Sequence, residues 1–259
     1  MKTGLAGRKA IVCASSKGLG RACAEALAAE GCDVLINGRT VETVTETAAA
    51  IRRAFPAVEV REVPGDVTRS DVQEALIHAW EAPDILVNNA GGPPPGDFRE
   101  WARDDWIRAL DANMLTAIML IRAMVDGMMD RRFGRIVNIT SAAVKSPIET
   151  LGLSNGARAG LTGFCAGLAR QTVARNVTIN GLLPGPFATD RLRQTMTGRA
   201  SSGESLEEAM AREARDNPAG RFGDPDEFGA ACVFLCSARA GFITGQNLVL
   251  DGGAFRGTL

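Results

Sequence analysis

The chain predicts an α/β fold in which helices cover both faces of a parallel sheet. Short apolar stretches alternate with amphipathic ones along the whole sequence, which is the pattern of repeated strand–helix–strand units. The expected strands are almost continuously apolar, as strands buried on both faces are. The 259 residues are 46% hydrophobic and contain no linker, repeat or low-complexity tract, so we expect a single domain over residues 1–259.

Each element follows from its local pattern. Short apolar runs predict the strands, and apolar residues at helical spacing predict the helices between them. Pro225 marks the start of a last helix, because proline suits a first helical turn and its acidic neighbours favour the positive end. The expected strands are Ala10–Cys13, Asp33–Ile36, Val58–Val63, Asp84–Val87, Arg135–Ile139, Val177–Leu182 and Phe242–Asp251. The other expected helices are Gly18–Glu30, Val41–Phe55, Ser70–Trp80, Asp104–Arg131 and Leu151–Ala174.

The composition argues against several classes of function. The formal net charge is −1, so neither a polyanion nor a membrane surface is expected as a partner. No apolar run is expected to reach the length of a membrane span, and the start of the chain is too short and polar for a signal peptide. The six cysteines contain no C-x-x-C pair, and the single histidine, His78, lies far from the carboxyl edge of the expected sheet. We therefore expect a cytoplasmic protein with reduced, buried thiols and no metal site.

Lys9–Arg21 is expected to form a strand, a tight turn rich in glycine and serine, and the start of a helix. Such a turn directs backbone N–H groups and the partial positive charge of a helix N-terminus at one place, where a phosphate binds well. Gly18 and Gly20 would let a pyrophosphate approach the backbone closely. Taken alone, the motif is equally compatible with a plain tight turn.

Two cations indicate which dinucleotide is preferred. The second expected strand is followed by Arg39 and not by an acidic residue, and Lys17 lies in the first turn. Nicotinamide cofactors differ at this point, because an acidic side chain binds the ribose 2′-hydroxyl whereas arginine accommodates a 2′-phosphate. The alternative is two solvated surface cations. The phosphate interpretation is favoured, and NADP(H) is expected in preference to NAD(H).

Further motifs follow the later strands, and with them the sequence resembles the short-chain dehydrogenase/reductase family, in particular 3-oxoacyl-(acyl carrier protein) reductases. The resemblance covers nearly the whole chain. It implies one doubly wound Rossmann-fold domain with a seven-stranded parallel sheet, oxidoreductase activity on a small molecule, and a homotetramer or dimer. The matching residues are Ser15–Gly20, Asp66, Asn88–Gly91, Asn113, Ser141, Asn180, Pro184-Gly185, Thr189 and Asp251–Gly253.

The resemblance also implies which residues bind the cofactor. Asp66 would bond the adenine edge, the Pro-Gly turn and Thr189 would contact the nicotinamide end, and Arg158 would hold the nicotinamide ribose. The full set expected at the cofactor is Ser15, Ser16, Lys17, Gly18, Leu19, Gly20, Arg39, Asp66, Val67, Asn89, Ala90, Gly91, Arg158, Pro184, Gly185, Pro186 and Thr189.

The catalytic residues that the resemblance implies are Ser141, Asn113, Ser154 and Arg158. In the family a serine bonds the substrate oxygen, an asparagine holds a water in a proton relay, and a tyrosine and a lysine follow the serine at fixed spacing. Ser141 and Asn113 match the first two, and the alternative for Asn113 is a hydrogen-bonded asparagine of the core. Ser154 and Arg158 stand where the tyrosine and the lysine are expected, and the chain contains no tyrosine at all.

The missing phenol bears directly on the reaction. Hydride addition to a ketone leaves an alkoxide, which a tyrosine with an ordinary pKa of about 10 can protonate once a neighbouring ammonium lowers that pKa. A serine hydroxyl is a weaker acid. An arginine keeps its proton, although Arg158 can stabilise a developing anion electrostatically.

Three interpretations of the site follow. In the first, another group delivers the proton: Lys145, Glu149, or a water ordered by Asn113 and Ser154. In the second, the substrate is an imine or an enone, whose reduction avoids a localised alkoxide. In the third, the protein is a non-redox lyase or isomerase, or a nucleotide-binding module. Reduction remains the first choice because the cofactor residues and Ser141 are present.

One departure from the family concerns the backbone of the first turn. Cys13 and Ala14 replace the Thr-Gly pair that the family commonly has. Because alanine disfavours positive φ, the turn is expected to open in an ordinary conformation.

The segment of about residues 187–220 is expected to form a lid over the substrate. Leu192, Met196, Leu206 and Met210 would give it an apolar underside, as they would any amphipathic surface helix. Its five arginines are offset by six acidic residues, so the segment suggests no charge on the substrate.

Overall fold

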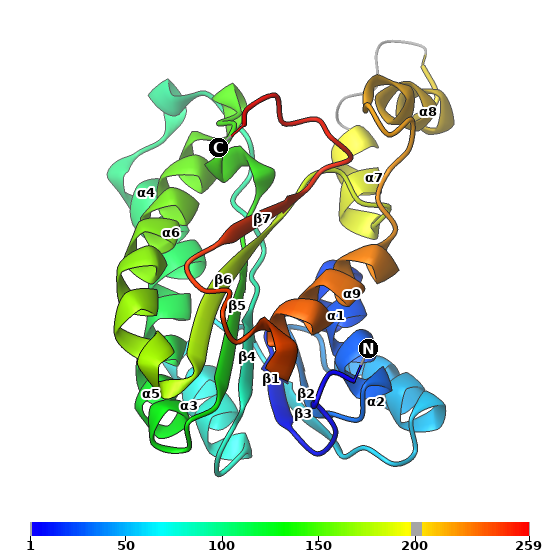
Figure 1. Cartoon of the computed structure of the whole chain (residues 1–259). Helices are drawn as coiled ribbons and strands as arrows, with labels where there is room; N and C mark the ends of the chain where they lie inside the picture. Colours follow the sequence, from blue (N-terminus) through cyan, green and yellow to red (C-terminus); the bar gives the residue numbers. More distant parts are fainter. Residues whose placement is uncertain (1, 198–203, 259) are drawn as a thin grey trace.

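A seven-stranded parallel sheet forms the centre of the molecule (Figure 1) in the computed structural model, which describes residues 2–197 and 204–258. The strands are β1 Lys9–Val12, β2 Asp33–Gly38, β3 Val60–Pro64, β4 Ile85–Asn88, β5 Gly134–Ile139, β6 Val177–Pro184 and β7 Asn247–Leu250. Their spatial order is β3-β2-β1-β4-β5-β6-β7, and every neighbouring pair is parallel.

Helices cover both faces of this sheet (Figure 1). They are α1 Gly18–Ala29, α2 Val41–Ala54, α3 Ser70–Ala79, α4 Arg103–Leu110, α5 Thr116–Asp130, α6 Gly152–Thr172, α7 Asp190–Thr197, α8 Leu206–Asp216 and α9 Pro225–Cys236. One core cluster joins the sheet to α1, α2 and α9 through residues such as Leu27 and Phe228. The other joins it to α3, α5 and α6 through residues such as Leu120 and Leu161. This is the doubly wound arrangement that the sequence predicts.

The strand order reverses between β1 and β4, and this reversal positions the site. β2 and β3 follow β1 on one side, whereas β4 begins the series on the other side. The connections that leave the carboxyl ends of β1 and β4 therefore diverge, which opens a crevice for a ligand at that edge. The segments that follow β1 to β6 bring most of the predicted site residues to the same edge.

The long helix predicted over Asp104–Arg131 is interrupted. α4 ends at Leu110, α5 begins at Thr116, and Asp111–Leu115 between them forms a π-helical turn, η2. A π turn accommodates an extra residue and re-aims the side chains that follow, and such turns are frequent at functional sites. The apolar pattern runs across the turn without a break, so the sequence predicts one continuous helix.

The expectation that no segment is long and apolar enough to cross a membrane is wrong for this stretch. Among the described residues, the helical segment Arg103–Asp130 has the required length and composition. Leu120, Ile121 and Met128 of this segment are buried in the core against the sheet. The segment is accounted for as a core helix of the domain.

The last strand is shorter than the predicted Phe242–Asp251. β7 covers only Asn247–Leu250, because Phe242 is fully exposed and Gly245 turns the chain with a φ of +69°. The register of β7 on β6 begins only after this turn.

The predicted lid contains two short helices, α7 and α8, which pack against each other beyond the end of β6 (Figure 1). Met196 on α7 and Ala209 on α8 are buried. Residues 198–203 of the segment lie outside the described residues, and the function of the pair as a lid stays a prediction.

Four thiols lie in the core where α1 packs against α9. Cys23, Cys32, Cys232 and Cys236 are fully buried and free, and Cys232 interacts with both Cys23 and Cys236. The two helices pack closely, since a Cβ on Gly229 of α9 would lie 2.6 Å from a backbone oxygen of α1. These thiols are enclosed by the contact between the two helices.

Candidate active site

The N-terminus of α1 is open to an anion. Lys17 occupies the N-cap position without a side-chain hydrogen bond to the helix, and the first turn holds no acidic residue. The first N–H groups of the helix are therefore available, and the partial positive charge of the helix end is not offset. Gly18 has a φ of +57°, and a Cβ there would lie 3.8 Å from Thr189 Cγ2, across the entrance of the turn.

Ala14 does not adopt the ordinary conformation that we expected from its type, because its φ is +45°. Its N–H donates to Asn37 Oδ1 over 3.0 Å, and its carbonyl oxygen accepts from Asn89 Nδ2 over 3.1 Å. These two bonds hold the residue against a strain of about 1–2 kcal/mol for a left-handed alanine. The same carbonyl oxygen explains why position 20 is a glycine, because a Cβ there would lie too close to it.

The two serines of the turn differ in what they can offer a cofactor. The hydroxyl of Ser15 is fully buried, donates to the Val12 carbonyl over 2.6 Å and accepts from the Asn37 N–H. Its backbone N–H also donates to the Asn37 carbonyl oxygen over 2.7 Å, so Ser15 supports the turn from inside and offers a ligand neither its hydroxyl nor its N–H. Ser16 is half-buried and packs against the place that a Cβ on Gly38 would occupy.

Lys17 and Arg39 are both exposed, and neither forms an ion pair with another residue of the described chain. The side-chain amide of Asn37, near the end of β2, forms hydrogen bonds with the backbone of Ala14, Val63 and Gly65. The charge at this corner of the crevice is therefore positive and uncompensated, which favours a phosphate.

The loop after β3 carries Asp66 and Val67. Asp66 Oδ1 accepts from both the N–H and the hydroxyl of Thr68, so the loop is preorganised while the second carboxylate oxygen keeps free acceptor capacity. Val67 is buried at the base of the crevice. This geometry is compatible with the predicted contact to an adenine edge.

Two further connections close the crevice from the other strands. Asn89, Ala90 and Gly91 leave β4, and Asn89 binds the first turn directly. Gly185 follows β6, and a Cβ there would lie 2.7 Å from the side chain of Asp251. The remaining predicted cofactor residues of these connections and of the first turn are Leu19, which packs against the core, Pro184, Pro186 and Thr189.

Ser154 and Arg158 stand one turn apart on α6 and form a pair. Arg158 Nη1 donates to Ser154 Oγ over 3.1 Å, and Ser154 is buried. Ser141 accepts from the Ala143 N–H over 3.1 Å at the start of a short 3₁₀ helix, Ala142–Val144, which packs against α6. Its hydroxyl proton remains free to bond a ligand oxygen. The structure thus brings the predicted serine and the Ser–Arg pair to adjoining elements.

Arg158 is held in an environment that disfavours its charge. Burial, and then the positive charge of Arg191, lower the pKa of the guanidinium to about 10. Arg158 has no carboxylate partner within the described residues. At neutral pH it is still a cation, so it can stabilise a negative charge but cannot supply a proton efficiently.

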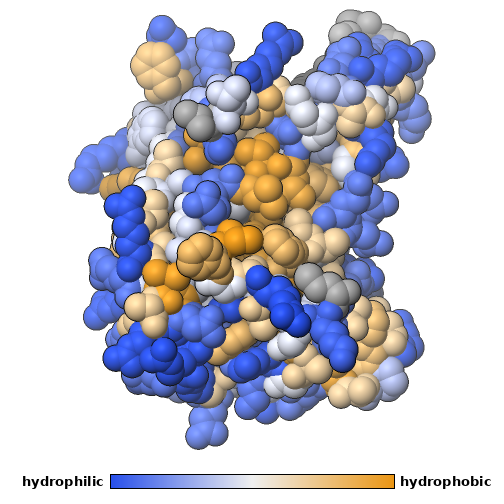
Figure 2. All heavy atoms as spheres, in the orientation of Figure 1, coloured by the Kyte–Doolittle hydropathy of each residue, from blue (hydrophilic) through white to orange (hydrophobic). Residues whose placement is uncertain are grey.

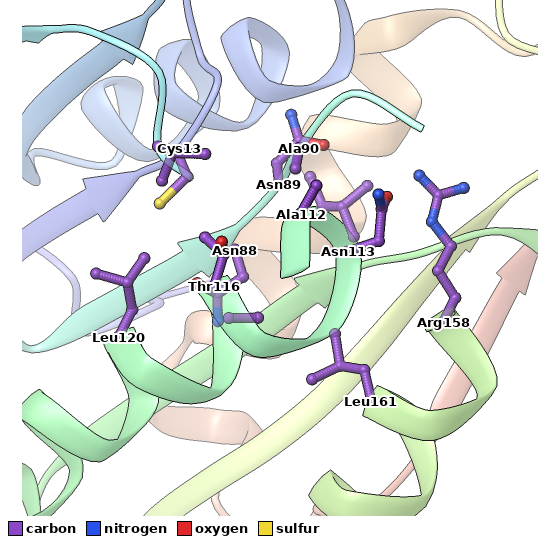
Figure 3. Close-up of a pocket in the computed structure, with 13 residues that line it drawn as sticks. Cys13, Asn88, Asn89, Ala90, Ala112, Asn113, Thr116, Leu120, Arg158 and Leu161 are labelled. Atoms are coloured by element: carbon purple, nitrogen blue, oxygen red, sulfur yellow. The ribbon is translucent and has the colours of Figure 1, made fainter. Parts of the chain in front are cut away.

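A cavity of about 20 Å³ lies behind Arg158, between β4, the π turn and α6 (Figure 3). Asn113 from the π turn, Asn88 and Thr116 line it. Asn88 Oδ1 and Thr116 Oγ1 are buried and have no hydrogen-bond partner. The space suffices for one water molecule, and these polar groups would bind it. Asn113 Nδ2 donates to the Ala109 carbonyl oxygen over 3.4 Å, and the role of Asn113 in a proton relay stays a prediction. The cavity adds Thr116, which no sequence motif indicates.

The two alternative proton donors lie on the surface. Lys145 and Glu149 are exposed, and the Lys145 ammonium lies 5.7 Å from the centre of the Phe255 ring. No group of three or more His, Cys, Asp or Glu side chains in the described part of the chain could hold a metal ion.

The comparisons with known proteins agree with this geometry. The family model described as enoyl-(acyl carrier protein) reductase matches residues 13–254. A 3-oxoacyl-(acyl carrier protein) reductase, FabG, from Vibrio cholerae is 33% identical, with 97% of this chain and 98% of the relative covered. The chain belongs to the short-chain dehydrogenase/reductase family.

Solved structures of this family confirm the predicted fold. L-sorbose reductase from Gluconobacter frateurii, in complex with NADPH and L-sorbose, has a TM-score of 0.94 and 30% identity, with 99% of this chain and all of the other covered. YwfH, an NADPH-dependent reductase involved in bacilysin biosynthesis, has a TM-score of 0.92 and 27% identity, with 97% of this chain and all of that chain covered.

Proposed function

We propose that the protein is an NADP(H)-dependent reductase of a small carbonyl compound, or of a related imine or enone. The observation that carries this proposal is the open N-terminus of α1, flanked by the uncompensated cations Lys17 and Arg39. Helix N–H groups would bind the pyrophosphate, and Lys17 and Arg39 would bind a 2′-phosphate. The complex of L-sorbose reductase with NADPH supports a nicotinamide cofactor.

The reacting groups lie at the other end of the crevice. The bound cofactor would supply a hydride. Ser141 would donate a hydrogen bond to the substrate oxygen, and Arg158 would stabilise the negative charge that develops on it. Ser154 holds Arg158 in place. The proton would come from a water at the cavity lined by Asn113 and Thr116 and not from a side chain.

A second candidate is a non-redox reaction in the same pocket. It is favoured by one observation, namely that Arg158 pairs with a serine hydroxyl in a chain that contains no tyrosine. A cation in this position stabilises an enolate as well as an alkoxide. A lyase or isomerase would use the same residues without net hydride transfer, and a nucleotide-binding module would only bind the cofactor.

We also propose a cytoplasmic homo-oligomer, a tetramer or a dimer. β7 is an edge strand, and Figure 2 shows apolar side chains gathered over and beside it. Phe234, Phe242 and Leu248 are apolar side chains left exposed on this part of the described chain. Burial of such a surface against a second copy would be favourable.

Cofactor titrations test the proposal. We expect NADPH to bind at least about tenfold more tightly than NADH, and Arg39→Asp to weaken NADPH by about 10- to 100-fold, since hydrogen bonds to charged groups contribute about 1.5–3 kcal/mol. Arg53→Asp, at an exposed arginine farther along α2, is the matched control and should leave both affinities unchanged.

A substrate screen then separates the candidates. Oxidation of NADPH by ketones, imines or enones supports the reductase. Conversion of a compound without change in the nicotinamide absorbance supports the lyase or isomerase. Absence of affinity for both coenzymes would refute the proposal.

A further inference from the structure

Two arginines from different elements converge at Gly92. A Cβ on this glycine would lie 3.1 Å from Arg158 Nη2 and 3.0 Å from Arg191 Nη2. Arg191 Nη2 also donates to the Gly92 carbonyl oxygen over 3.3 Å. Arg158 projects from α6 beside Asn113 (Figure 3), whereas Arg191 lies in the first turn of α7. The absence of a side chain at position 92 makes room for both guanidinium groups.

These two cations have no compensating anion. Neither takes part in an ion pair with any residue of the described chain, and the side-chain partner of Arg158 is the neutral hydroxyl of Ser154. Like charges that approach each other are unfavourable, and the pKa of Arg158 is lowered by burial first and by the charge of Arg191 second. A bound anion between the two groups would remove this cost and accept hydrogen bonds from both.

The position of the pair indicates which anion it takes. The groups suited to the cofactor phosphates, the N-terminus of α1 with Lys17 and Arg39, lie at the turn after β1 and at the end of β2. Gly92 instead follows the connection from β4, on the side where Ser154 and Arg158 stand. An anion at Gly92 therefore lies next to the reacting groups.

We propose that Arg158 and Arg191 bind a carboxylate of the substrate, so that the substrate is a small carbonyl compound, imine or enone that also carries a carboxylate. Arginine suits this task because its planar fork matches the two oxygens of a carboxylate. The Gly92 carbonyl orients Arg191, and Ser154 orients Arg158. This inference rests on the proposed function, since it identifies the class of substrate of the same site.

Paired ligands test the inference without knowledge of the natural substrate. The NADPH-saturated enzyme is titrated with pyruvate, phenylpyruvate and 2-oxoglutarate, each beside its amide or ester, and the quench of NADPH fluorescence is followed. We expect the acids to bind at least about tenfold more tightly than their neutral partners, because a charge-assisted contact contributes about 1.5–3 kcal/mol. Arg191→Gln should abolish this preference. Arg193→Gln, an exposed arginine on the same helix, should keep it.

Each outcome bears on the inference. Equal binding of acids and neutral partners, binding of neither, or a preference that survives Arg191→Gln overturns it. If Arg191→Gln weakens NADPH by about tenfold or more and the acids bind no better than their amides, the pair binds a cofactor phosphate and the inference is wrong. In all these cases NADPH still binds the wild type, so the proposed function stands. Failure of the wild type to bind NADPH would refute both.

Discussion

The coenzyme region and the reacting region of this crevice are built in opposite ways. Around the first turn, the side chains of Ser15, Asn37 and Asn89 form hydrogen bonds with backbone groups. The unpaired charges of this region belong to the exposed cations Lys17 and Arg39. Around α6 and α7, by contrast, Arg158 and Arg191 are held close together with only neutral partners. The first region holds a backbone in a shape that a ligand can use. The second holds two cations that form no ion pair with any residue of the described chain.

Replacement of Arg158 should separate the two regions most clearly, because it should affect the reaction far more than cofactor binding. We expect Arg158→Met to lower kcat by about 10²- to 10³-fold, the typical cost of removing a group that stabilises transition-state charge. NADPH affinity should fall by less than about tenfold, because most of the cofactor contacts lie in the other region. Steady-state kinetics on a substrate from the screen, with a fluorescence titration of NADPH, measure both.

The control for this variant is Arg170→Met, an exposed arginine on the same helix. It should leave both quantities unchanged. A value of kcat for Arg158→Met within about twofold of the wild type would contradict the assigned role of this residue, because loss of a charge-stabilising group costs far more.

A pH profile sharpens the same comparison. Because the pKa of Arg158 is about 10, we expect kcat/KM to fall by about tenfold per unit of pH above 10 and to be insensitive to this group at neutral pH. For a carboxylate substrate, the pH at which kcat begins to fall should be higher, because the bound carboxylate stabilises the protonated form of Arg158. Arg158→Met should lack this fall, and its presence in that variant would assign it to another group.

The same lowered pKa affects stability with a definite sign. Between pH 10 and the ordinary, higher pKa of an arginine, the unfolded chain holds the proton on Arg158 more tightly than the folded protein does. The contribution of Arg158 to the free energy of unfolding therefore rises with pH across that range. Below the range, this contribution destabilises the folded protein. Circular dichroism at each pH separates this contribution from a loss of activity through unfolding.

The smallest effect concerns the coenzyme region. We expect Ala14→Gly to raise the free energy of unfolding by about 0.5–1 kcal/mol, because it removes strain of about 1–2 kcal/mol while the extra freedom of the unfolded chain costs about 0.4–1 kcal/mol. Urea denaturation measures the change. Ala6→Gly, at an exposed alanine whose φ is not positive, should be destabilising instead. A loss of stability in Ala14→Gly would show that the turn is not strained.

Much of the fold follows from local pattern alone. The alternation of apolar strands with helices predicts the sheet and both its faces, since each unit buries its own apolar side chains. The prediction fails for Ala14 because its conformation depends on Asn37 and Asn89, which are distant in sequence. It fails for the helix over Asp104–Arg131 because a π turn changes hydrogen bonding without changing the apolar pattern.

The site was predicted less completely than the fold. The sequence motifs locate the Ser154–Arg158 pair on one helix, because residues four apart share a face. No sequence motif indicates Arg191, because the charges of residues 190–220 nearly balance and their sum hides where each charge lies. Thr116 gave no signal, because a threonine within an apolar helix is ordinary. Only the structure shows that its buried hydroxyl lines the cavity beside the π turn and has no hydrogen-bond partner.

The buried thiols at the contact between α1 and α9 can report local opening of the core. All six thiols are buried, so a maleimide can react only with molecules in which local packing has opened. Helix α1 also presents its N-terminus to the crevice. A dinucleotide bound at that end would therefore slow the labelling of Cys23, which lies five residues along the same helix from Gly18, and the alkylation rate would report occupancy without any turnover.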